Sequence, residues 1–167
     1  MTVILGIDPG TGTTGYGGIE VSDEQRNMEI LGCGTVSTPT DMPFQNRLKA
    51  IHDSIQTLVD KFSPSVVAVE ELYFSKNVKT AIDVGHARGA IMVSLAEIEV
   101  TVEEYNPLTI KKTLTGNGNA DKKAVQKMVK QELELTETPS PNDAADALAI
   151  AICHNLQSRF ESKIDQS

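Results

Sequence analysis

The sequence predicts an α/β protein, in which a five-stranded mixed sheet is flanked by helices on both faces and residues 1–167 form a single domain. Two observations predict this fold. Three segments with strand character follow one another closely near the N-terminus, which is typical of a meander. After them, helical and strand-like segments alternate, which is typical of strands joined by crossover helices. A chain of 167 residues fits one domain and is long enough for a substantial core.

Runs of apolar residues define the predicted strands. The first run ends at Asp8, and the fourth, Val66-Val67-Ala68-Val69, ends at Glu70 and is typical of a buried strand. A polar turn at residues 22–25 separates the second strand from the third. The five predicted strands cover residues 3–8, 16–21, 28–36, 66–69 and 101–105.

Apolar residues spaced three and four apart predict the helices. In the first helix, Ile51, Ile55 and Leu58 keep this spacing, and Ser63-Pro64 ends it. In the helix that begins at Lys122, apolar residues occupy one side and lysines the other. The predicted helices cover residues 43–62, 77–98, 122–135 and 142 to about 158, with a flexible loop at 116–119.

The charge of the chain is unevenly distributed. The net charge of −8 argues weakly against a polyanionic partner. Residues 111–130, however, carry six lysines against one acid, Asp121, so this segment is +5 and the rest of the chain is −13. One basic face on an acidic body indicates a surface that binds nucleic acid.

Cysteine usage and the N-terminal sequence predict a cytoplasmic protein with no membrane partner. Cys33 and Cys153 lie in apolar runs, where free thiols in a reducing compartment are favoured over a disulfide. No apolar run approaches the ~20 residues that span a bilayer. Residues 1–5 lack the basic region and the cleavage site of a signal peptide.

The stretch GIDPGTGTTGYG, residues 6–17, contains the pattern G-x-G-x-x-G. A dinucleotide site needs a helix directly after such glycines. Here residues 16–21 are β-formers with two glycines, so the match favours a hairpin over a phosphate loop. Actin- and hexokinase-like ATPases begin similarly, but they use two such lobes and this chain supplies one. We expect the glycines to let another backbone approach closely, including that of a nucleic acid.

Two acids end predicted strands that meet at one edge of the sheet. Asp8 ends the first strand and Glu70 the fourth. Alternatively, Asp8 begins a turn, because Asp-Pro-Gly is a common turn sequence, and Glu70 is a solvated surface residue. Their shared position favours a joint role as metal ligands.

Two further acids lie one turn apart in the last predicted helix. Asp143 and Asp146 share one face of this helix. Asp143 also fits a capping box, with Ser140 as the N-cap and Pro141 as the first helical residue. Asp146 has no such account, because it lies inside a helix that is apolar nearly all round. An unpaired buried carboxylate costs several kcal/mol. No lysine or arginine lies within one turn, so a metal ion is the expected partner.

Four carboxylates on two strand ends and one helix suit Mg²⁺, for which Mn²⁺ is expected to substitute. Two ions ~3.5–4 Å apart would activate a water molecule and stabilise the leaving oxygen of a phosphodiester. We expect two ions in each site when substrate is bound. No zinc-binding spacing and no serine-hydrolase motif is present. The residues predicted to bind metal and to act in catalysis are Asp8, Glu70, Asp143 and Asp146.

Three motifs resemble those of the bacterial Holliday-junction resolvases of the RuvC type. They are Ile4-Leu5-Gly6-Ile7-Asp8-Pro9-Gly10 with Thr14-Gly15-Tyr16-Gly17, then Val69-Glu70-Glu71-Leu72-Tyr73-Phe74-Ser75-Lys76-Asn77, and Asp143-Ala144-Ala145-Asp146-Ala147-Leu148-Ala149-Ile150-Ala151. The resemblance runs in order from residue 3 to about residue 155. Ala-Arg-Gly at 87–89 and Gly-x-Gly at 116–118 add to it.

The resemblance implies a ribonuclease-H-like fold and a magnesium-dependent, homodimeric endonuclease. Such an enzyme nicks two strands of a four-way DNA junction symmetrically during recombination and repair, leaves 5′-phosphates, and works with the RuvA–RuvB branch-migration complex. The family's catalytic acids match the four acids named above. Its DNA contacts match Tyr73, which would probe the junction, together with Lys76, Lys111 and Lys122. The chain is more acidic than expected of this family and lacks a basic tail, which bears on its DNA affinity.

Two alternative functions remain open from the sequence: a nuclease of the same fold that processes ribosomal RNA, and a non-catalytic nucleic-acid-binding module. The four intact acids argue against the second. A further question is the dimer interface. Ala81, Gly85, Gly89 and Ala96 place small residues along one side of the helix at 77–98, where either a two-fold mate or the chain's own sheet could approach closely.

Overall fold

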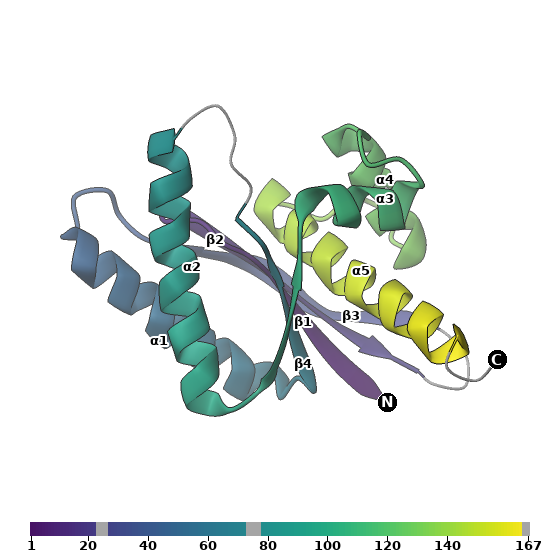
Figure 1. The fold of residues 1–167 in the computed structure, drawn as a ribbon, viewed down its shortest axis with the longest axis horizontal. Coiled ribbons are helices and arrows are strands. Elements are labelled where there is room, and N and C mark those ends of the chain that lie inside the picture. Colours follow the sequence, from purple (N-terminus) through teal and green to yellow (C-terminus); the bar gives the residue numbers. More distant parts are fainter. Residues whose placement is uncertain (23–26, 73–77, 165–167) are drawn as a thin grey trace.

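The structure is a computed structural model that describes residues 1–22, 27–72 and 78–164. One mixed sheet lies between two layers of helices (Figure 1), which confirms the predicted fold. The strands are β1 (Thr2–Asp8), β2 (Thr13–Val21), β3 (Met28–Ser37), β4 (Val66–Glu70) and β5 (Thr101–Tyr105). The helices are α1 (Phe44–Phe62), α2 (Val78–Ile98), α3 (Pro107–Thr115), α4 (Lys122–Glu132) and α5 (Asn142–Ile164).

The order of strands in the sheet is β3-β2-β1-β4-β5. Strands β1, β2 and β3 form the predicted antiparallel meander, whereas β4 runs parallel to β1, and β5 runs parallel to β4. Ile7 pairs with Val69 in this register, so the next residues, Asp8 and Glu70, lie side by side at the carboxyl ends of two parallel strands. Sheet topology therefore brings the two strand-ending acids together.

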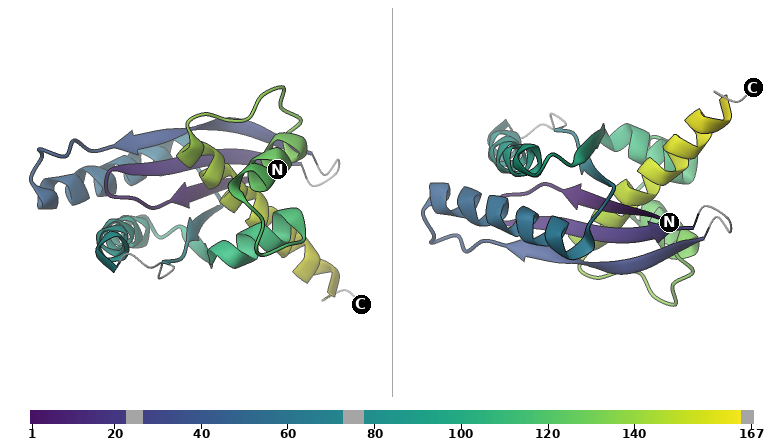
Figure 2. Two further views of the ribbon diagram at one scale, coloured as in Figure 1. Left: turned by 90° about the horizontal axis from the view of Figure 1, so that it is seen from above. Right: turned by 90° about the horizontal axis from the view of Figure 1, so that it is seen from below.

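Each face of the sheet has its own hydrophobic core. Figure 2 shows the helices on either side of the sheet in two further views. Side chains alternate along β1. Leu5 and Ile7 pack with α1 and α2, whereas Ile4 packs with α3, α4 and α5. The central strands are buried on both faces, which explains their nearly continuous apolar sequence.

Glycines in β1 and β2 allow α5 to lie very close to the sheet. A Cβ atom on Gly6 would lie 2.0 Å from the backbone oxygen of Ala147, and one on Gly15 would lie 2.1 Å from that of Asp143. The expectation that these glycines leave room for a nucleic-acid backbone is wrong at both positions, because the backbone of α5 occupies that space.

Helix α3 was not predicted from the sequence. The Asn106 side chain caps it by accepting a hydrogen bond from the Thr109 backbone N–H, and Pro107 follows at the start of the helix. Only Ile110 and Leu114 are buried. A nine-residue helix with two buried residues has too short an apolar repeat to stand out, and Asn-Pro looks like a turn.

The helix ends also differ from the prediction. Helix α5 begins at Asn142, as predicted, and the Pro141 carbonyl accepts hydrogen bonds from the backbone N–H groups of Ala144 and Ala145. Pro141 therefore precedes the helix instead of being its first residue, and the expected Ser140 N-cap is wrong. Helix α4 ends at Glu132, before residue 135, and α5 continues to Ile164, beyond residue 158.

Cys33 and Cys153 are free thiols, as expected. Among the helices that the structure describes, none is both long and apolar enough to cross a membrane.

Candidate active site

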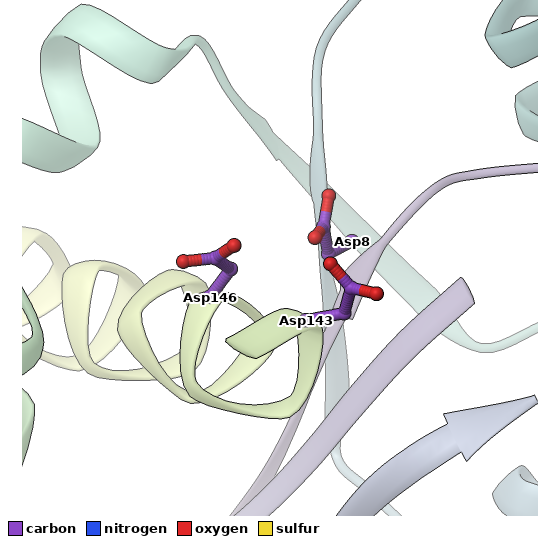
Figure 3. Close-up of side chains that lie close together, drawn as sticks. All are labelled: Asp8, Asp143 and Asp146. Carbon is purple, nitrogen blue, oxygen red and sulfur yellow. The ribbon is translucent and has the colours of Figure 1, made fainter. Parts of the chain in front are cut away.

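Three of the predicted acids converge at the carboxyl end of β1. Asp8, Asp143 and Asp146 each offer a carboxylate oxygen, and these oxygens lie within 4.8 Å of one another. Figure 3 shows Asp8 beside Asp143, with Asp146 one turn further along α5. Glu70 adjoins Asp8 at the end of β4 and lines the same cavity of about 260 Å³ as Asp8 and Asp146.

Elements far apart in the sequence position these acids. The parallel pairing of β1 with β4 places Asp8 beside Glu70. The close approach of α5 brings its first turn, which carries Asp143, against β2 at Gly15, and Gly15 is the residue that pairs with Asp8 in the sheet. The site therefore depends on the packing of α5 as much as on the acids themselves.

The crowding of acids changes the protonation of the two most enclosed carboxyl groups. Burial, followed by repulsion from Glu70, Asp146 and Asp143, raises the pKa of Asp8 to about 8. Burial and repulsion from Asp146 raise the pKa of Glu70 to about 7, although a hydrogen bond with Asp8 opposes this shift. A site that disfavours its own negative charge in this way suits added cations. The residues present thus fit a divalent metal ion.

Asp146 already has a cationic partner in the structure. The Lys122 Nζ atom, at the start of α4, donates a hydrogen bond of 2.8 Å to Asp146 Oδ2. A cation does meet Asp146, as expected, but it is a lysine from another helix and not only a metal ion. The expectation that Asp146 is buried is wrong, since its side chain is 29% exposed. The contact was missed because it joins residues 24 positions apart on different helices.

Of the residues predicted to contact DNA, the structure describes Lys111 and Lys122. Lys111, on α3, lines the acidic cavity together with Lys122, so both lysines face the site. Their positive charges lower the pKa of Glu70. Tyr73 and Lys76 lie outside the described residues, so their roles stay predictions.

The raised pKa values predict a pH dependence of stability and of metal binding. Between the ordinary pKa values of 3.8 and 4.5 and the raised values of about 8 and 7, the folded protein holds protons on Asp8 and Glu70 that the unfolded chain releases. Stability without metal should therefore fall as the pH rises through this window. A divalent metal ion that binds here must displace these protons, so its affinity should rise from pH 6 to pH 8.

Thermal melts in EDTA at several pH values, together with calorimetric titrations of Mg²⁺, would measure both effects. In the variant Asp8→Asn, stability should depend less on pH. Melting temperatures that rise steadily from pH 5 to pH 8 in EDTA would contradict the raised pKa values.

The sheet order and the gathered carboxylates define the class of protein: a ribonuclease-H-like nuclease, which hydrolyses phosphodiesters. Within this class, the family model for crossover junction endodeoxyribonuclease RuvC matches residues 4–154. The chain belongs to this family.

Individual relatives agree with this assignment. The chain is 49% identical to the crossover junction endodeoxyribonuclease RuvC of Thermotoga petrophila, over 93% of each chain. It is similar to the solved structure of Thermus thermophilus RuvC, with a TM-score of 0.88 and 37% identity over 95% of this chain and 96% of the other. The Thermus thermophilus protein in complex with a Holliday junction substrate matches with a TM-score of 0.89 and the same identity, over 96% and 97% of the two chains.

Proposed function

We propose that this protein resolves four-way DNA junctions by metal-dependent nicking of two strands at symmetric positions. The observation that carries the proposal is the convergence of Asp8, Asp143 and Asp146, two of which, Asp8 and Asp146, line one open cavity together with Glu70. Membership of the crossover junction endodeoxyribonuclease family supports the choice of DNA junctions as substrate. A relative that is 37% identical has been solved with a Holliday junction substrate, which supports the same choice.

In the proposed mechanism the four acids hold Mg²⁺, with Mn²⁺ as a substitute, and two ions are present when DNA is bound. When bound, such ions would activate a water molecule and stabilise the leaving oxygen. Departure of the 3′-oxygen would leave 5′-phosphates and 3′-hydroxyls. Asp8 comes from the sheet and Asp143 from α5, so the two elements together present these carboxylates. Asp8 and Glu70 must lose their protons before they can bind metal. Lys111 and Lys122 face the same cavity, where they would contact phosphate oxygens.

The two lysines provide a test of the DNA-binding face. Lys111→Ala and Lys122→Ala should each weaken junction binding and reduce the slope of log affinity against log salt concentration by about 0.9 per lost phosphate contact. Fluorescence anisotropy across a salt series would measure the slope. Lys49→Ala is a suitable control, because Lys49 lies on α1 and pairs with Asp53. Unchanged slopes for both variants would show that neither lysine contacts the DNA.

Symmetric nicking of a two-fold junction calls for a two-fold dimer. An exposed stripe on α2 supports an interface there, because Ile82 is 53% exposed, Val93 is 54% exposed, and Gly89 lies between them on the same face. Ala81 is buried in the protein's own core, so at this position the alternative of packing within the chain holds. We therefore propose that Ile82, Gly89 and Val93 meet a second copy of the chain.

The variant Gly89→Leu should turn the dimer into a folded monomer that no longer makes paired nicks. A Cβ atom at Gly89 meets no atom within 4 Å, so the larger side chain should leave the protomer intact. Sedimentation would report the oligomeric state, and Lys127→Leu on the exposed side of α4 is the matched control. A wild-type monomer that makes paired nicks at micromolar concentration would refute the symmetric mechanism.

Three further proposals follow from the family. Residues 1–167 form one nuclease domain around one sheet, the protein works in the cytoplasm, and its partners include the RuvA–RuvB branch-migration complex. The first is supported by the two cores that flank a single sheet. Pull-down of RuvA and RuvB with the purified protein would test the third.

A ribosomal RNA substrate is the competing proposal. A direct test compares cleavage of a synthetic four-way DNA junction with cleavage of structured precursor ribosomal RNA at equal concentrations in Mg²⁺. We expect junction DNA to be cut and the RNA to remain intact. Faster cleavage of the RNA would contradict the proposed function and favour processing of ribosomal RNA.

A further inference from the structure

Lys122 contacts the acid cluster through Asp146. Its ammonium group lies 2.8 Å from Asp146 Oδ2, and Asp146 is one of the three acids whose oxygens converge. The same lysine lines the cavity that Asp8 and Glu70 also line, so its positive charge faces the other acids of the site. In this structure the lysine is the cation nearest to Asp146 among the ion pairs of the described residues.

The base of this lysine is held firmly against α5. Asp121 caps α4 by accepting a hydrogen bond from the Ala124 backbone N–H, which fixes the first turn. One turn further on, Gln126 Nε2 donates a hydrogen bond of 3.0 Å to Asn142 Oδ1. The contacts of Lys122 with Asp146 and of Gln126 with Asn142 thus link α4 to the start of α5 at two successive turns of α4. The Lys122 backbone is fixed beside the site.

The end of the side chain is less constrained than its base. The Lys122 side chain is 51% exposed, and the lysine stem is long and flexible. The hydrogen bond to Asp146 is the one that the structure gives its ammonium group within the described residues. Release of one carboxylate would therefore let the ammonium group move within the open cavity while α4 stays in place.

We propose that Lys122 is an exchangeable counterion, which pairs with Asp146 before metal binds and is displaced toward the DNA phosphate when the metal ion arrives. This inference rests on the proposed function, because it takes Asp146 to be a metal ligand. A divalent ion on the Asp146 carboxylate and an ammonium group 2.8 Å from the same carboxylate repel each other strongly in a partly dry site. The two cations therefore compete for one acid.

Competition predicts two effects of opposite sign when the ammonium group is removed. The metal-free protein should become less stable, because the remaining acids lose a neutralising charge. Metal binding without DNA should become stronger, because the ion no longer has to break the bond between Lys122 and Asp146. A lysine with a purely structural role would lower stability without strengthening metal binding.

The variant Lys122→Met tests the proposal, since methionine keeps most of the apolar stem. Calorimetric titration with Mn²⁺ at pH 8 and without DNA should show a dissociation constant about tenfold lower than that of the wild type. The melting temperature in EDTA should fall by about 2–4 °C. The control is Lys111→Met, in the same cavity but without a contact to Asp146, which should change the dissociation constant by less than about threefold.

A second arm separates competition for Asp146 from a general effect of charge. In an Asp146→Asn background, Lys122→Met should lower the melting temperature in EDTA by less than it does in the wild type, because the ion pair with the contested carboxylate is already gone. If Lys122→Met binds Mn²⁺ no more tightly than the wild type does, the proposed exchange is wrong, but the proposed metal site is not contradicted. No Mn²⁺ binding by either protein would overturn the proposed metal site, and the exchange with it.

Discussion

The variant Asp146→Asn is expected to lose cleavage of junction DNA by roughly 10³-fold or more while it continues to bind the junction. Asparagine keeps the shape of the side chain and can still accept the hydrogen bond from Lys122, so the contact between α4 and α5 should survive. It removes the charge that holds a metal ion. It also removes a repulsion that raises the pKa of Asp8 and Glu70, so the stability of the metal-free protein should not fall.

Single-turnover cleavage of a labelled four-way junction would measure the loss, and a gel shift in EDTA would measure binding. Asp60→Asn, at an exposed position on α1, is the matched control and should cleave normally. If Asp146→Asn cleaves at near the wild-type rate in Mg²⁺, Asp146 is not an essential metal ligand.

The second large effect is expected from Gly15→Ala, which adds a single methyl group. Its Cβ atom would lie 2.1 Å from the Asp143 backbone oxygen and 2.6 Å from the Asp143 carbonyl carbon, a clash with backbone that no rotation of a side chain relieves. Either the sheet or the start of α5 must move. We expect a loss of about 3 kcal/mol in the free energy of unfolding, at the upper end for overpacking. Activity should be lost as well, because Asp143 moves away from Asp8.

Gly12→Ala is a sensitive control, because it adds the same methyl group in the same hairpin. The nearest atom to a Cβ there is the Arg47 Nη2 atom, at 3.9 Å, which is ordinary contact. Thermal melts of both variants in EDTA would separate the two positions, with a fall of roughly 6–12 °C for Gly15→Ala and little change for Gly12→Ala. Equal melting temperatures would show that α5 does not depend on the glycine at position 15.

Much of the fold could be predicted because the responsible signals are local. The apolar runs before Asp8 and Glu70 are long enough to define central strands, and parallel pairing of their ends follows from the alternation of strands with helices. Helix α3 was missed because its two buried residues give no clear repeat. The start of α5 at Asn142 was predicted, but its C-terminal end was placed too early, because no residue of the helix after Asn155 is buried and the last turns carry no apolar repeat.

The acids of the candidate site could be predicted from the sequence, but the contacts that other residues make with them could not. Spacing along one helix placed Asp143 and Asp146 together, and strand order placed Asp8 beside Glu70. The contact between Lys122 and Asp146 depends on how α4 packs on α5, which no local pattern encodes. The role of Gly15 was misassigned for the same reason, since the glycine pattern shows that a backbone comes close but not which one.

The most direct test of the account is cleavage of a four-way junction and a linear duplex of the same sequence in one reaction, with Mg²⁺ or with EDTA. The account predicts paired nicks at symmetric positions in two strands of the junction, products that ligase can reseal, an uncut duplex, and no cleavage in EDTA. Equal cleavage of the junction and the duplex, or cleavage that persists in EDTA, would contradict it.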